Sequence, residues 1–205
     1  HICGLEVQLH PIAPIDLDHL GGEAVELEDH VELLVTHLCP HQAGLQGRLA
    51  EVLLEHGAAL VGPGSEWQSS LLTALQFGYR ETAAVLVRRG APIDSLVIAA
   101  GLGNLAETKR FLAQADGKTR HAALALAAQV GHAEVVRLLL DAGEDPNRYN
   151  LEGFHSHSTP LHQAVWGNHL DVVRLLVERG ARLDIKDTIY QGTPLGWARY
   201  GKVKK

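Results

Sequence analysis

Hydrophobic and polar positions follow one recurring frame along much of the chain. The segment TPLHQAVWGNHLDVVRLLVERGARLD (159–184) aligns without a gap with AALALAAQVGHAEVVRLLLDAGEDPN (122–147), and SSLLTALQFGYRETAAVLVRRGAPID (69–94) falls on the same frame. Each copy holds two short stretches whose apolar residues recur every three to four positions, as they do on one face of a helix. The pattern therefore predicts pairs of antiparallel helices.

Small residues mark the expected ends of these helices. They follow the first stretch of each copy at Gly78, Gly131 and Asn168, and the second stretch at Gly90, Gly143 and Gly180. Glycine and asparagine readily adopt the left-handed conformation that ends a helix. Thr159 and Pro160 favour a helix start, because Thr is a good N-cap and Pro suits the first helical position. None of these helices is long enough to be stable alone, so stacking of successive pairs must form the core.

Three segments make a resemblance to a known family specific: TPLH (159–162), GHAEVVRLLLDAGEDPN (131–147) and GTPLGWA (192–198). With them the chain resembles ankyrin-repeat proteins of the type common in bacteria, whose units are about 33 residues long. The resemblance implies an all-α repeat solenoid of stacked helix-turn-helix ankyrin repeats with short β-hairpin fingers. The expected units are 42–68, 69–94, 95–119, 120–153, 154–187 and a partial unit 188–205, after a degenerate N-terminal repeat or cap over residues 1–41.

The spacing of the units departs from the regular repeat at two places. Gly78 and Gly103 are only 25 residues apart, so we expect the finger between those units to be absent. Gly131 and Asn168 are 37 residues apart, and the four extra residues fall within FHSHS (154–158). The histidine-rich stretch is therefore interpreted as an insertion at a finger tip, followed by a regular helix start.

Four histidines within residues 154–169 raise the question of a metal or catalytic site. His155, His157 and His162 could supply three imidazoles to Zn²⁺ and leave a position open for water. Against this, His162 is the histidine of TPLH, which in ankyrin repeats usually hydrogen-bonds the backbone of a neighbouring unit. We therefore favour structural histidines on an enlarged finger and expect no cofactor. A metal-binding or hydrolytic protein that uses residues 154–162 is the alternative.

Two further patterns resemble ligand sites. SLVIAAGLGNLAETKRFL (95–112) could be the strand, glycine turn and helix of a dinucleotide site. The same residues also fit the repeat frame, and no parallel strands are predicted elsewhere, so we expect repeat helices there. HLCPH (37–41) places two histidines around a cysteine, but its proline and its spacing match no usual zinc pattern. A helix boundary is expected at this point.

Composition narrows the classes of function. The 205 residues are 46% hydrophobic and 20% charged, as is ordinary for a globular protein. The formal net charge of −6 argues against non-specific nucleic-acid binding, and no apolar run approaches the roughly 18 residues of a membrane helix. Two cysteines are too few for a disulfide framework, so a cytoplasmic protein is expected. Protonation of all thirteen histidines would add thirteen positive charges, so acidification should alter the surface strongly.

A stack of repeats offers a concave surface formed by its fingers and first helices. The resemblance implies protein–protein recognition without catalysis, through residues that the fold leaves free. The expected partner contacts are Gln76, Phe77, Gln129, Glu152, Phe154, His155, His157, Trp166, Tyr190 and Tyr200. We expect Trp166 and Tyr200 to lie side by side on consecutive first helices, where exposed aromatic residues favour binding. The partner is a protein of unknown identity or, alternatively, another domain of a longer chain on which this segment packs.

Overall fold

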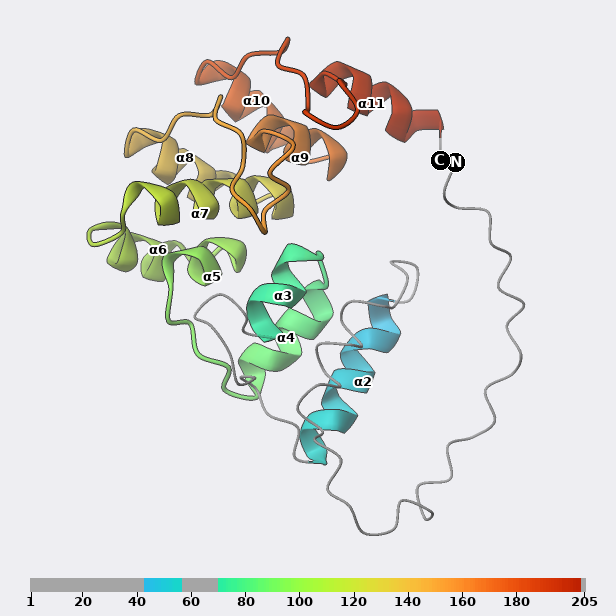
Figure 1. Cartoon of the computed structure of the whole chain (residues 1–205). Coiled ribbons are helices and arrows are strands. Elements are labelled where there is room, and N and C mark those ends of the chain that lie inside the picture. Colours follow the sequence, from blue (N-terminus) through green and yellow to red (C-terminus); the bar gives the residue numbers. More distant parts are fainter. Residues whose placement is uncertain (1–42, 57–69, 204–205) are drawn as a thin grey trace.

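The computed structural model describes residues 43–56 and 70–203, and in these ranges it contains ten α-helices and no β-strand (Figure 1). The first helices of the pairs are α3 (Ser70–Gln76), α5 (Leu96–Gly101), α7 (Gly117–Val130), α9 (Pro160–Trp166) and α11 (Pro194–Val203). The second helices are α4 (Arg80–Arg88), α6 (Leu105–Leu112), α8 (Ala133–Asp141) and α10 (Leu170–Glu178). The remaining helix, α2 (Ala43–Glu55), packs on α4 and so belongs with the second helices.

The helices form two layers along the stack. Each first helix contacts the next one, from α3 through α5, α7 and α9 to α11. In the other layer α8 contacts both α6 and α10. This arrangement confirms an all-α repeat fold, and residues 1–42 and 57–69, which include HLCPH and the expected N-terminal cap, lie outside the described residues.

Helix ends follow the predicted frame. The six helix-ending positions all have positive φ: Gly78, Gly90, Gly131, Gly143, Asn168 and Gly180. Asn168 adopts this left-handed conformation, with a φ of 58°, although it carries a side chain. Thr159 is the N-cap of α9, and Pro160 is its first residue. Both the backbone N–H and the hydroxyl of Thr159 donate to Nδ1 of His162, at 3.3 and 2.8 Å. The local sequence therefore determines where α9 begins and which way the histidine ring faces.

Small residues let the first helices approach closely. Ala74, Ala99, Ala127 and Ala164 occupy equivalent positions and are all fully buried. In α5, a Cβ at Gly101 would lie only 2.7 Å from a methyl carbon of Leu126, so glycine is needed there for close packing of α5 on α7. Residues 95–112 form two repeat helices rather than a strand followed by a helix, as the repeat frame predicts.

The connections between units differ in length as the spacing predicts. Residues 89–95 join α4 to α5 without a finger. Longer loops follow α8 and α10, and we name them the first finger (residues 144–159) and the second finger (residues 182–193). Both fingers are irregular loops, so the expected β-hairpins are not confirmed. A backbone hydrogen bond crosses each loop, from the Asn150 N–H to the Ser158 carbonyl and from the Asp187 N–H to the Gly192 carbonyl, both at 2.8 Å.

Candidate protein-binding surface

Five aromatic rings gather where α9, α11 and the two fingers meet. Trp197 of α11 is at the centre, with its ring centroid 5.8 Å from that of Trp166, 5.8 Å from that of His157 and 5.1 Å from that of His162. His157 also makes an edge contact with Tyr190, at 6.4 Å between centroids. Four segments of the chain therefore contribute to one continuous aromatic cluster.

Much of this cluster is open to solvent. Trp166 is 58% exposed, Tyr190 76% and Tyr200 56%, whereas Trp197 and His157 are half-buried beneath them. Tyr200 is three residues after Trp197, so the two lie on neighbouring positions of the α11 surface. We use the name aromatic patch for five residues: His157, Trp166, Tyr190, Trp197 and Tyr200. Trp166 packs edge-on against Trp197, and Tyr200 lies one turn further along α11.

A buried carboxylate holds the patch in place. Asp187 is fully buried, and its Oδ1 accepts hydrogen bonds from the backbone N–H groups of Ile189 (3.0 Å) and Tyr190 (2.6 Å). Its Oδ2 accepts from the Gly192 N–H (2.8 Å) and from the indole Nε1–H of Trp197 (2.9 Å). Burial raises the pKa of Asp187, but these hydrogen bonds together outweigh it and hold the pKa below its usual value. The second finger and α11 are thereby joined through one side chain.

His162 makes a second connection between the units. Its ring is fully buried, and Nε2 donates to the carbonyl of Gly192 at 3.1 Å while Nδ1 accepts from Thr159. Burial lowers the pKa of His162 and outweighs the hydrogen bond to Gly192, which raises it, so the neutral ring is favoured. This geometry confirms the expected role of the TPLH histidine as a link to the neighbouring backbone.

The three histidines considered as zinc ligands are not arranged as a site. Both ring nitrogens of His162 are already used within the protein. His155 is exposed, and its ring makes only an edge contact with His157, at 6.0 Å. Within the described ranges, no three His, Cys, Asp or Glu side chains are grouped so that they could hold a metal ion.

Phe154 is buried, so the expectation that it contacts a partner from an exposed position was wrong. The side chain is only 5% exposed and packs in the hydrophobic core. The first finger turns back on itself through a hydrogen bond from the Ser158 N–H to the His155 carbonyl at 3.0 Å, and this turn directs the Phe154 ring inward. Glu152 and His155, on either side of it, are exposed as expected.

The two glutamines predicted for the concave face form hydrogen bonds across the stack. The Gln129 side chain donates to the carbonyl of Gln76, and the Gln76 side chain donates to the carbonyl of Gly153 at 3.0 Å. They therefore fix the first finger to α3 and α7, although neither side chain is fully buried. Phe77 is 54% exposed and stacks on Tyr79, with 6.0 Å between the ring centroids.

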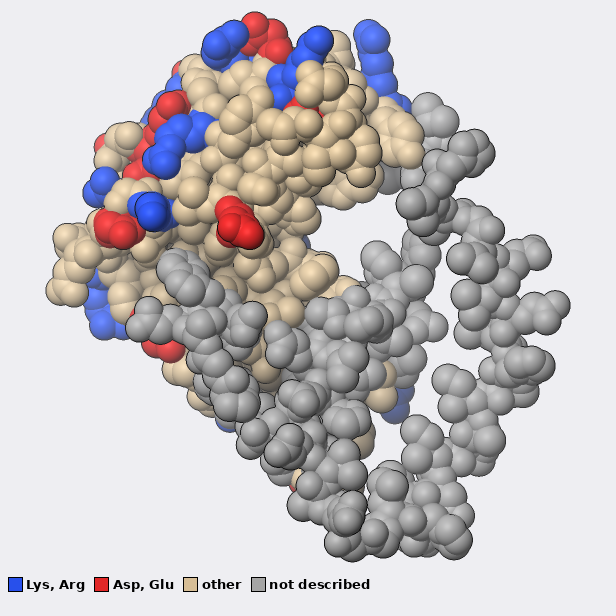
Figure 2. Space-filling model, in the orientation of Figure 1, with Lys and Arg blue, Asp and Glu red and all other residues tan. Residues whose placement is uncertain are grey.

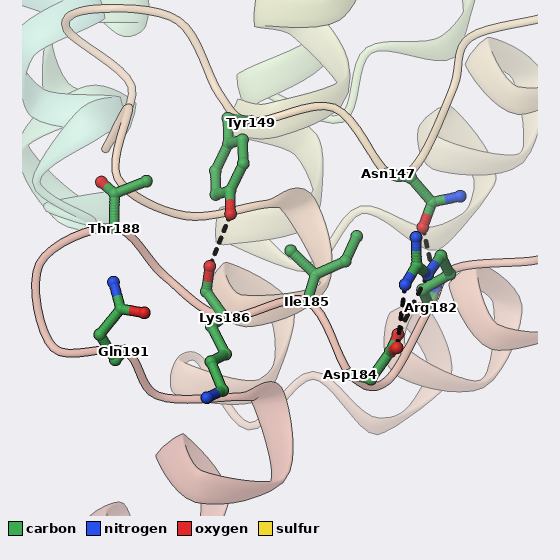
Figure 3. Close-up of a pocket in the computed structure, with 8 residues that line it drawn as sticks. All are labelled: Asn147, Tyr149, Arg182, Asp184, Ile185, Lys186, Thr188 and Gln191. Atoms are coloured by element: carbon green, nitrogen blue, oxygen red, sulfur yellow. Dashed lines mark hydrogen bonds and ion pairs between the residues drawn. The ribbon is translucent and has the colours of Figure 1, made fainter.

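A shallow open groove of about 540 Å³ lies between the two fingers. Figure 3 shows its lining side chains, several of which bind each other instead of pointing to a common centre. The Tyr149 hydroxyl donates to the Lys186 carbonyl at 2.6 Å, and Arg182 pairs with Asp184 at 2.9 Å. These pairings leave no convergent set of groups, so the groove is a weaker candidate than the aromatic patch.

Comparison with known proteins identifies the fold. Residues 96–187 match the family model described as ankyrin repeats, in three copies. A putative ankyrin repeat-containing protein of Treponema pallidum is 34% identical over 119 residues, which cover 58% of this chain and 32% of that protein. The chain is an ankyrin-repeat protein.

Other relatives share the repeats within longer proteins. Rabankyrin-5 of Homo sapiens is 32% identical over 127 residues, covering 62% of this chain and 10% of that protein. Ankyrin repeat and SOCS box protein 3 of Homo sapiens is 37% identical over 113 residues, covering 40% of this chain and 22% of that protein. The chain therefore spans about a third or less of the length of these relatives. Ankyrin repeats generally mediate protein–protein interaction, and the matched segment carries Trp166 and His157 of the patch.

Sequence reasoning missed two residues that organise the surface of this ankyrin-repeat protein. Trp197 was considered only as part of a terminal unit, and Asp187 was not considered. Asp187 stands at the position that Asn150 holds in the preceding unit, since each donates its backbone N–H to the residue just before the Thr-Pro pair. An alignment of the two units on Gly143 and Gly180 places Asn150 and Asp187 at the same position and would have identified that position as polar.

Proposed function

We propose that this chain is a protein–protein interaction module that binds its partner through the aromatic patch and the adjoining finger tips, without catalysis. The observation that carries the proposal is the exposure of Trp166, Tyr190 and Tyr200 near a buried carboxylate, Asp187, which holds the Tyr190 backbone and the Trp197 ring. Aromatic side chains give a large contact area with few rotatable bonds, and they are frequent among the residues that dominate binding energy. A surface that is already ordered loses little entropy on binding.

The distribution of charge supports the same surface. In the view of Figure 2, Lys, Arg, Asp and Glu side chains gather along the edge formed by α6, α8 and α10, and the surface over α9 is mostly uncharged. Along the second helices these charges pair with each other, as in the contact between Arg179 and Asp141. Charged residues are depleted at the centre of protein interfaces, so the side with α9 suits a partner better.

The competing functions have less support. A metal-dependent or hydrolytic site on the first finger would need His162, whose two ring nitrogens are engaged by Thr159 and Gly192. None of the described helices has the length and apolar character needed to span a membrane. The net charge of −6 favours a protein partner over nucleic acid. Another domain of a longer chain could occupy the same patch, and we propose a cytoplasmic location from the cysteine content alone.

The test compares two variants that remove equally exposed apolar groups. Trp166→Ala changes the patch, and Leu170→Ala changes a residue of the same 58% exposure at the start of α10. Both should melt within a few degrees of the wild type. In affinity capture from native lysate with quantitative mass spectrometry, Trp166→Ala should lose a protein that the wild type and Leu170→Ala retain. Equal capture by all three proteins would contradict the proposed surface.

A further inference from the structure

One buried histidine lies next to the aromatic patch and joins three of the elements that form it. His162 of α9 is fully buried, and its ring lies edge-on to Trp197 of α11, with 5.1 Å between the centroids. Its Nε2 donates to the carbonyl of Gly192 in the second finger at 3.1 Å. Gly192 in turn donates its N–H to Asp187, which also holds the indole of Trp197. The ring of His162 therefore connects α9, the second finger and α11.

These contacts require the neutral ring of His162. Nε2 carries the proton, because the carbonyl of Gly192 can only accept. Nδ1 is then the bare nitrogen, and the backbone N–H of Thr159 donates to it at 3.3 Å. A second proton on Nδ1 would face that N–H as another donor. The hydroxyl of Thr159, at 2.8 Å, can turn and accept from the protonated ring, but the backbone N–H loses its acceptor.

The surroundings of His162 offer no partner for a positive charge. Burial is the largest influence and lowers the pKa of His162, and the imidazole of His157 in the first finger lowers it further. The hydrogen bond to Gly192 and the carboxylate of Asp187 raise the pKa without reversing its direction. Each oxygen of Asp187 already accepts two N–H groups, so its capacity is taken up. A charged ring at this place would therefore be buried without a counter-ion.

The helices packed against α9 do not change this balance. α9 itself contains no Asp, Glu, Lys or Arg. The charged and titratable groups of its neighbours include Lys118, Arg120 and His121 of α7, Asp171, Arg174 and Glu178 of α10, and Arg199 of α11. The two carboxylates of α10 are exposed, and the ring of α11 that contacts His162 is the uncharged Trp197. Charge affects the pKa of His162 only from Asp187 and His157.

Two partly buried histidines make a similar bond without the same consequence. Nε2 of His132 and Nε2 of His169 donate to carbonyls of the preceding unit, those of Gly101 at 3.0 Å and Gln129 at 2.9 Å. Among the described residues, neither Nδ1 has a hydrogen-bond partner, so a second proton there breaks no bond. His169 is therefore a suitable control for His162.

We propose that protonation of His162 releases the second finger from α9 and opens the aromatic patch, so that the patch binds its partner at neutral pH and loses it in mild acid. The inference rests on the proposed function and names the regulation of that surface. The charged ring turns out towards solvent, because a buried charge without a counter-ion is costly. The bond to Gly192 then breaks, and Trp197 loses the ring that packs against it. The helices before α9 keep their contacts, so the change is local.

An NMR titration of the purified full chain between about pH 8 and about pH 4.5 tests the switch without a partner. Because burial holds the pKa of His162 below the unfolded value of about 6.5, the patch is complete above that pH and opens as the pH falls through the lower folded-state pKa. The His162 ring, the Trp197 indole N–H and the Gly192 amide should shift with one common midpoint. His162→Gln keeps a donor but cannot titrate, so it should remove this midpoint, and His169→Gln should keep it.

Peptides without histidine, selected from a displayed random library at about pH 7.5, measure the effect on binding. Only peptides that lose affinity for Trp166→Ala are used. One pH unit below the common midpoint about a tenth of the chains remain closed, so the Kd of these peptides should rise about tenfold for the wild type and for His169→Gln. The Kd for His162→Gln should be the same at both pH values.

The contrary results are distinguishable. A His162 ring that stays neutral until the stack unfolds, or that titrates while the Trp197 signal remains constant, would overturn the switch. Peptides that depend on Trp166 and bind equally well at both pH values would also overturn it and leave the proposed surface standing. If every selected peptide binds Trp166→Ala as tightly as the wild type, the surface itself is contradicted, and the regulation of binding with it.

Discussion

Asp187→Asn should destabilise the C-terminal part of the stack more than any other substitution of similar size in the second finger. The carboxylate is fully buried, and four N–H groups donate to its two oxygens. Asparagine keeps one of these oxygens and replaces the other by an NH₂ group, which cannot accept. Two of the four donors therefore lose their acceptor and face another donor.

The magnitude follows from the number of donors left without a partner. A buried polar group without a hydrogen bond costs about 1–3 kcal/mol, and bonds to a charged acceptor lie at the upper end. With two such donors we expect a loss of about 3 kcal/mol or more in the free energy of unfolding. This is a large fraction of the roughly 5–15 kcal/mol by which most domains are stable.

Urea unfolding at neutral pH measures the effect, with circular dichroism and tryptophan fluorescence as independent signals. The fluorescence should change first, because Trp197 donates directly to Asp187. Asp184→Asn is the matched control, since Asp184 belongs to the same finger but is exposed and pairs only with Arg182. It should leave the midpoint unchanged. If Asp187→Asn lost less than about 1 kcal/mol, the four hydrogen bonds would not have the strength argued here.

Acid should remove the same contribution in the wild type. The folded-state pKa of Asp187 lies below its usual value, so the group stabilises the fold above the unfolded pKa of about 3.9. This stability is lost as the pH falls through the lower folded-state pKa. In Asp187→Asn this part of the acid sensitivity should be absent, and urea unfolding at a series of acidic pH values would detect the difference.

Three further predictions test the packing of the units. Gly131→Ala should destabilise the fold by about 1 kcal/mol more than Gly143→Ala. Both glycines have positive φ, but only a Cβ at Gly131 would overlap the ring of His169. Equal melting temperatures of the two variants would contradict this. Burial lowers the pKa of His132, His162 and His169, so their contribution to stability is complete above the unfolded pKa of about 6.5 and is lost as the pH falls through the lower folded values. The free energy of unfolding should therefore decrease between about pH 7 and pH 5, and a constant value would oppose the assignment. Amide hydrogens of α11 should exchange faster than those of α7, which is buried between α5 and α9, and equal protection would indicate an additional contact on α11.

The repeat architecture was predictable because it depends on local rules. The left-handed positions, Thr159 with Pro160, and the buried Leu161 follow from turn chemistry and apolar spacing within one unit. The absence of a finger before α5 followed from counting residues between Gly78 and Gly103. In each case a few neighbouring residues contain the information.

The surface depended on contacts between units, which spacing alone does not predict. Phe154 lies in an insertion, and nothing in its neighbours indicates that the first finger turns back and buries the ring. Trp197 and Asp187 were missed because their bond joins a loop to the following helix. Burial of four histidines, with His162 among them, lowers their pKa values, so acidification adds less charge than the count of thirteen histidines suggests.

Site-specific photo-crosslinking tests the proposed binding surface most directly. A benzophenone amino acid is placed at position 166 in one protein and at position 170 in another, since Trp166 and Leu170 are equally exposed on opposite layers of the stack. After irradiation in native lysate, the protein labelled at position 166 should form a defined crosslinked product with a partner, and the protein labelled at position 170 should not. Crosslinks of equal yield at both positions, or only at position 170, would show that the aromatic patch is not the binding surface.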